Sequence, residues 1–178
     1  MYKRQDIHFG GGLDNGANTV TAGRTASDGI PDGWAADTST IAINIGEGAL
    51  TSADINTINT GGGNLTMFAK STSGVDGMAF NWTSRVDSGQ GQIDLRAESA
   101  GWGLQLNRGG DNDTYTNKSI FTSRSASHPA IYMSGKSSTT TGEVALLGSW
   151  GDVGKDNLLI QALGTGGVHL VGEAPNTT

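Results

Sequence analysis

Two aspartates separated by one residue form the first pattern in the chain that could bind a metal ion. Asp111 and Asp113 follow a pair of glycines inside a long polar stretch, residues 107–119. Carboxylate oxygens two positions apart on a loop can begin a Ca²⁺ site. The glycine and distal glutamate of an EF-hand loop are missing, as is the repeated nonapeptide of a calcium β-roll. Asp111 and Asp113 are therefore weak candidate metal ligands, a solvated turn is the simpler interpretation, and we expect no cofactor.

The sequence predicts no catalytic residue. A glycosidase needs two carboxyl groups held across a cleft, but Asp94 and Glu98 share the polar face of one expected strand, the usual position of solvated charges. There is no Gly-x-Ser-x-Gly elbow, and no complete Gly-x-x-x-x-Gly-Lys-Ser/Thr phosphate loop. The histidines at positions 8, 128 and 169 lie far apart in the sequence, without the spacing of metal ligands. An enzymatic role is thus the less favoured one.

Aromatic residues are prominent in this polar chain and could contact sugars. Tryptophan and tyrosine rings stack on sugar C–H surfaces, while neighbouring amides and carboxylates bind the hydroxyls. Trp34 follows a Pro-Asp-Gly turn, Tyr115 lies in the long polar stretch, and Trp150 precedes Gly-Asp. We predict that these three residues bind a glycan. Trp82 and Trp102 alternate with apolar residues and are expected in a core.

Composition excludes several classes of partner. The chain has 178 residues and a net charge of −6, whereas a nucleic-acid surface requires a basic patch. No run approaches the ~20 apolar residues of a membrane span, so we expect neither nucleic-acid binding nor membrane insertion. The chain has no cysteine, which rules out disulfides and thiolate zinc sites. Only 35% of residues are hydrophobic, so burial of apolar faces against further copies of the chain is expected to complete a thin core.

Alternating apolar and polar residues predict strands along most of the chain. In residues 93–98 the odd-numbered residues Ile93, Leu95 and Ala97 share one face, and charged residues share the other. Similar runs occur at residues 41–45, 64–69, 78–82, 102–106, 130–133 and 143–147. Glycine, asparagine and serine interrupt these runs, and no stretch has helical periodicity. We therefore predict an all-β fold of antiparallel hairpins, sandwich- or prism-like and intertwined in a homotrimer.

The last predicted hairpin lies at residues 156–172. A short strand precedes Gly-Thr-Gly-Gly and a second strand follows it, which is the local signal of a hairpin because glycine supplies the positive φ of a tight turn. Residues 92–97 and 103–106 repeat the order strand, turn, strand. This similarity indicates either a repeat that stacks hairpins or the ordinary appearance of β-hairpins.

The same segment also resembles a known family. Residues 156–172 resemble a segment common near the C-termini of bacteriophage tail fibres and tailspikes, of the type N-L-x-I-x-x-x-G-T-G-x-V-x-L. The resemblance implies a structural virion component located in the virion tail, which forms a homotrimer and attaches to a bacterial surface polysaccharide. The expected assembly contacts are Leu158, Ile160, Val168 and Leu170. The alternatives are a fragment of a polysaccharide depolymerase and a monomeric extracellular carbohydrate-binding or adhesin module.

The sequence also suggests a division of the chain. Residues 1–5 resemble the translation of an adapter used in sequencing libraries, so we expect an artefact there and a metagenomic fragment of a longer protein; a genuine start with a short basic tag is the alternative. Residues 6–73 are expected to form a glycine-rich, stalk-like or loosely ordered β region, and residues 74–172 a C-terminal β domain. Residues 173–178 are expected to be a frayed tail.

Overall fold

A computed structural model describes residues 7–9, 13–14, 19–20, 35–37, 41–45, 55–71, 76–81, 83–108, 118–138, 146–147 and 157–175. All the regular secondary structure within these ranges consists of β-strands, which confirms the all-β prediction. Within the same ranges, no helix has the length and apolar character needed to cross a membrane.

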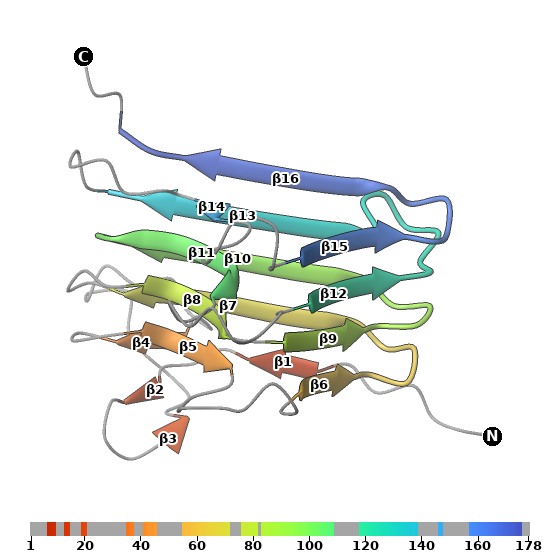
Figure 1. Cartoon of the computed structure of the whole chain (residues 1–178), viewed down its shortest axis with the longest axis horizontal. Coiled ribbons are helices and arrows are strands. Elements are labelled where there is room, and N and C mark those ends of the chain that lie inside the picture. Colours follow the sequence, from red (N-terminus) through yellow and green to blue (C-terminus); the bar gives the residue numbers. More distant parts are fainter. Residues whose placement is uncertain are drawn as a thin grey trace.

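Three parallel sheets form the body of the molecule (Figure 1). Sheet A contains β1 (Ile7–Phe9), β4 (Ala35–Asp37), β7 (Leu65–Ser71), β10 (Ile93–Ser99), β13 (Ile131–Ser137) and β16 (Val168–Glu173). Sheet C contains β5 (Ile41–Ile45), β8 (Asp76–Asn81), β11 (Trp102–Arg108) and β14 (Leu146–Leu147). Sheet D contains β6 (Ile55–Asn59), β9 (Thr83–Asp87), β12 (Lys118–Ser123) and β15 (Asn157–Ala162).

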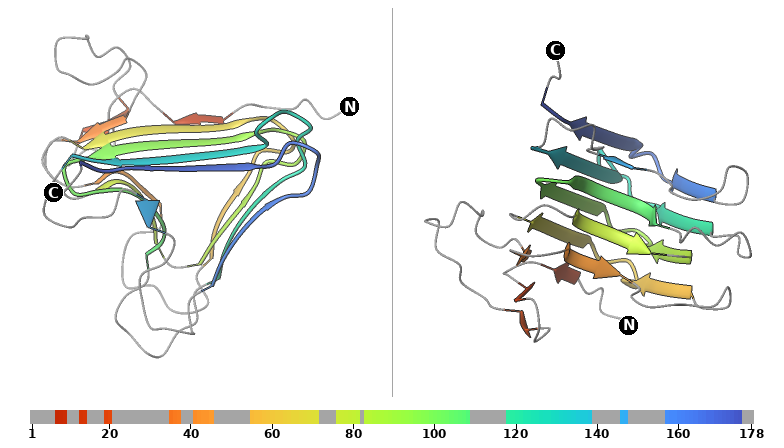
Figure 2. Two further views of the ribbon diagram at one scale, coloured as in Figure 1. Left: turned by 90° about the horizontal axis from the view of Figure 1, so that it is seen from above. Right: turned by 60° about the vertical axis from the view of Figure 1, so that its left-hand side comes forward.

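The chain visits these sheets in a fixed order and so forms a parallel β-solenoid. From β5 onward it passes through sheet C, then sheet D, then sheet A, and each set of three strands lies on the preceding set. We call each set a coil. Seen along the stacking direction, the three sheets form the sides of a triangle (Figure 2, left). The last coil consists of β14, β15 and β16.

The prediction of antiparallel hairpins is wrong. Strands β15 and β16, predicted as one hairpin, belong to different sheets, where β15 pairs with β12 and β16 pairs with β13 of the preceding coil, both in parallel. The glycine-rich turn between them carries the chain around a corner of the triangle and does not reverse it. Parallel neighbours need a long connection, which the other two strands of each coil provide. Among the described strands, only β2 (Leu13–Asp14) and β3 (Thr19–Val20) pair antiparallel.

The core consists of inward-facing residues stacked from coil to coil. In sheet A, Leu65, Ile93 and Ile131 are in register and completely buried. The next inward position holds Met67, Leu95 and Met133, which are also in register and completely buried. Phe80 of β8 meets Phe121 of β12 edge to face, with ring centroids 5.0 Å apart, so the interior of sheet C contacts that of sheet D. Buried and more exposed residues alternate along β10, which confirms the alternation predicted for residues 93–98.

Sheet C departs from the predicted pattern at one position. The alternation of residues 102–106 predicts that Gln105 faces outward, and Gln105 does lie on the opposite face from Leu104. It is nevertheless completely buried, and its amide nitrogen donates a 3.4 Å hydrogen bond to Asp76. Both faces of β11 are thus covered at this position, a property that alternation alone cannot reveal.

Close backbone contacts hold the coils together at the corner between sheets D and A. The carbonyl of Gly91 accepts hydrogen bonds from the hydroxyls of Ser88 (2.8 Å) and Ser123 (2.7 Å), so it joins two successive coils. The amide of Ser88 in turn donates to the carbonyl of Thr122 at 3.1 Å. A Cβ atom at Gly91 would overlap the carbonyl oxygen of Gly63 in the coil below. Glycine is therefore needed at this point because the two backbones touch.

Candidate functional site

The outer face of sheet A carries three rows of polar and aromatic side chains. The rows follow from the register, because residues paired between parallel strands point to the same side of the sheet. The first row is Thr66, Asp94, Tyr132 and His169. The second is Phe68, Arg96, Ser134 and Val171. The third is Lys70, Glu98, Lys136 and Glu173. We refer to these twelve residues as the outer face.

Arg96 is the centre of the best-ordered cluster on this face. Its Nε and Nη2 donate to the two carboxylate oxygens of Asp94, each at 2.8 Å. Its guanidinium carbon lies 5.0 Å from the ring centroid of Phe68 and 5.0 Å from that of Tyr132. Tyr132 in turn meets the His169 ring edge to face at 5.3 Å. Four parallel strands thus contribute to one cluster of rings around a fixed cation.

The charge of Arg96 is maintained by its surroundings. The hydrogen bonding of Arg96 to the Asp94 carboxylate raises the pKa of Arg96, partial desolvation opposes this change, and the Asp94 charge supports it. A guanidinium with a pKa above its ordinary value stays protonated throughout the accessible pH range. The bidentate geometry also fixes the plane of the guanidinium, so its remaining donors have defined directions.

A hollow of about 340 Å³ opens beside this cluster. Asp94, Arg96, Tyr132 and His169 line it, together with the corner residues Gln92, Ile93 and Pro129. The amide nitrogen of the Gln92 side chain donates to the Pro129 carbonyl at 2.8 Å, which holds the amide group at the rim. The hollow therefore combines aromatic surface with a carboxylate, an amide and a guanidinium.

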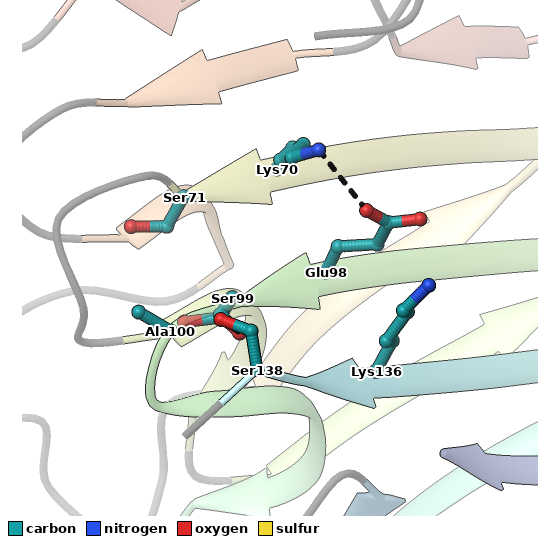
Figure 3. Close-up of a pocket in the computed structure, with 7 residues that line it drawn as sticks. All are labelled: Lys70, Ser71, Glu98, Ser99, Ala100, Lys136 and Ser138. Atoms are coloured by element: carbon teal, nitrogen blue, oxygen red, sulfur yellow. Dashed lines mark hydrogen bonds and ion pairs between the residues drawn. The ribbon is translucent and has the colours of Figure 1, made fainter. Parts of the chain in front are cut away.

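A second hollow, of about 320 Å³, lies at the other end of the same strands (Figure 3). Lys70, Glu98 and Lys136 stand side by side on three neighbouring strands, and the Lys70 ammonium lies 3.3 Å from the Glu98 carboxylate. The amide of Ser138 donates to the Ser99 carbonyl at 2.9 Å and closes the edge of the hollow. The second hollow thus offers charged hydrogen-bonding groups without an aromatic ring.

Asp94 and Glu98 do not form the carboxylate pair that a glycosidase needs. Asp94 is paired with Arg96, and Glu98 is paired with Lys70. The two carboxylates are four positions apart on one strand, a Cα spacing of about 13 Å, whereas glycosidase carboxyl groups lie about 5–9.5 Å apart. Among the described residues, no three His, Cys, Asp or Glu side chains gather as a metal site would require.

All five residues predicted from the sequence as ligand contacts lie outside the described residues. These are Trp34, Tyr115 and Trp150 for the glycan, and Asp111 and Asp113 for a metal.

The four predicted assembly residues all lie in the last coil. Leu158 and Ile160 of β15 are partly buried against the chain's own core, whereas Val168 and Leu170 of β16 are exposed. The two pairs thus differ in how much apolar surface they can offer to another copy of the chain.

The cluster around Arg96 was missed because its members come from different strands. Arg96 was treated as a solvated charge between Asp94 and Glu98, and Tyr132 as a residue of an apolar strand. The signal that could have found them is a pattern shared by residues 65–71, 93–99 and 131–137. In each segment the first and third residues are apolar, the fifth is alanine or glycine, the sixth is lysine or glutamate, and the seventh is serine. Aligning these segments places Phe68, Arg96 and Tyr132 on one face.

No protein-family model, curated protein or solved structure matches the chain.

Proposed function

We propose that the chain is a structural component of a phage tail fibre or tailspike, which forms a homotrimer in the virion tail and attaches to a bacterial surface polysaccharide. The proposal rests on the resemblance of residues 156–172 to such proteins and on the chemistry of the outer face of sheet A. The cluster of Arg96, Tyr132 and their neighbours is the observation that carries it.

The cluster provides the two kinds of contact that sugars require. Ring surfaces at Phe68 and Tyr132 suit the C–H faces of a sugar, and Asp94, Arg96 and Gln92 can exchange hydrogen bonds with its hydroxyls. The charges on this face balance in pairs, Arg96 with Asp94 and Lys70 with Glu98. A neutral polysaccharide is thus as acceptable as a charged one.

The solenoid supports binding by holding the face rigid. The outer residues project from strands whose inward neighbours are completely buried, so the backbone under the cluster has little freedom. Binding by a preorganised surface loses less conformational entropy. The two hollows lie about 13 Å apart along β10, which suits an extended chain molecule lying along the strands.

Replacing Tyr132 with alanine should weaken polysaccharide binding about tenfold, since one stacking contact contributes about 1 kcal/mol or slightly more. Tyr132→Phe keeps the ring and should bind nearly as well as the unchanged chain. The measurement is biolayer interferometry against a panel of purified capsular and O-antigen polysaccharides.

A matched pair of arginine variants tests whether the face itself is responsible. Arg96→Ala should weaken binding about tenfold or more, because it removes a charged donor from the hollow. Arg85→Ala should have no effect, since Arg85 is exposed on the outer face of sheet D. Equal binding by Tyr132→Ala, Arg96→Ala and Arg85→Ala would contradict the proposed site, and no binding to any polysaccharide would contradict the proposed attachment.

A further inference from the structure

Two inward-facing residues of the last coil, Val168 and Leu170, are exposed. Val168 continues the buried stack of Leu65, Ile93 and Ile131, yet 41% of its surface is exposed. Leu170 continues the next stack above the completely buried Met133 and is 47% exposed. Both side chains face the interior and are exposed because no described strand lies above them. The last coil therefore presents a cross-section of the core.

The free edge of β16 also offers backbone hydrogen-bonding groups. The amide of Ile131 donates to the carbonyl of Gly167 at 3.2 Å, so the odd-numbered residues of β16 direct their N–H and C=O groups toward β13. In a strand, alternate residues direct these groups to opposite edges. Val168, Leu170 and Gly172 thus direct theirs to the free edge, where no described strand accepts them. Such an edge is a template for another strand.

The opposite edge of sheet A does not match this one. At that edge β7 is already paired, with β1 along residues 65–67 and with β4 along residues 69–71. Each of these strands has only three residues, whereas β16 has six. Head-to-tail addition of copies through sheet A is therefore poorly supported, and pairing of two like edges is favoured.

We infer that a second copy of the chain covers this end, with the two β16 strands paired antiparallel about a twofold axis. In one register His169 lies opposite the partner's Glu173, and Leu170 lies opposite the partner's Gly172. The inward residues then exchange the hydrogen bonds, and the outward residues form the closer, non-hydrogen-bonded pairs. A histidine meets a glutamate twice, and a large residue meets glycine twice. The sequence of β16 is thus complementary to itself.

This pairing is independent of the proposed trimer. A twofold interface is isologous and closes on itself, so it doubles whatever assembly the rest of the surface makes. The inference predicts two copies, or six if trimers also form. One copy or three copies would overturn it. Three or six copies support the proposed homotrimer, and one or two contradict it, so the two ideas fail separately.

Light scattering coupled to size-exclusion chromatography of the whole chain measures how many copies each assembly contains. His169→Glu places two glutamates opposite each other and should raise the dissociation constant of the paired form about tenfold or more. The double variant His169→Glu/Glu173→His exchanges the two side chains and should restore the pairing. Positions 169 and 173 lie about 13 Å apart within one strand, so rescue requires contact between copies.

Circular dichroism of each variant establishes that the solenoid is folded before the masses are compared. Both side chains are exposed, and they contact the coil below at its surface, His169 at Tyr132 and Glu173 at Lys136, so the buried core should be unaffected. A paired form that is insensitive to His169→Glu, or a double variant that stays dissociated, would overturn the antiparallel register.

Discussion

Replacing Phe121 with alanine will lower the free energy of unfolding by about 3–5 kcal/mol. The Phe121 side chain is completely buried, and its ring meets that of Phe80 at 5.0 Å between sheets D and C. The variant leaves a cavity where two sides of the triangle meet, and stacked coils on both sides limit how far the structure can relax. Equilibrium denaturation in guanidinium chloride measures the change.

Phe68→Ala is the matched control, because it removes the same atoms from a different environment. Phe68 lies on the outer face of sheet A, half-buried, beside Arg96. Its loss should cost about 1 kcal/mol from the cation–π contact, with a modest further cost from lost burial. Equal destabilisation by the two variants would show that Phe121 does not lie in the core.

Gly91→Ala should be the most damaging change at any described corner and should cost about 3 kcal/mol or more. The added Cβ would overlap the carbonyl oxygen of Gly63, and backbone cannot move aside as the end of a side chain can. The change would also disturb the Gly91 carbonyl, which accepts hydrogen bonds from two serines. Thermal unfolding followed by circular dichroism provides the measurement.

Gly61→Ala isolates the cost of backbone conformation. Gly61 has a φ of +65°, but a Cβ there would have no neighbour within 4 Å. We expect a cost of about 1 kcal/mol from the left-handed conformation alone. If Gly61→Ala were as damaging as Gly91→Ala, contact between coils would not explain the requirement for glycine at position 91.

Local signals in the sequence predicted the strands of sheet C but missed β6, β9 and β12 of sheet D, and they did not predict which strands pair. The faces of β10 were correct because burial on one side imposes a period of two on residues 93–98. The partners of β15 and β16 were wrong because a glycine turn between two short strands looks the same in a hairpin and at a solenoid corner. Pairing depends on residues about one coil away, and the corners differ in length, so the repeat has no fixed period.

The candidate site was harder to predict than the fold. Each of its members looks ordinary in its own strand, where Arg96 is one charge among three and Tyr132 one aromatic residue among several. Their relation appears only when the coils are stacked and the register places Asp94 beside Tyr132. Site residues that come from neighbouring coils leave no local sequence motif. They can be found only once the register between the strands is known.

The length of the chain at the solenoid corners can change while the geometry of the outer face of sheet A stays the same. Residues 88–92 connect β9 to β10, whereas the longer segment 124–130 connects β12 to β13, yet Ile93 and Ile131 remain in register. Residues can therefore be gained or lost at a corner while the outer rows keep their alignment. A lineage of such proteins could change what borders the hollows, and so the ligand accepted, without redesigning the stack that supports them.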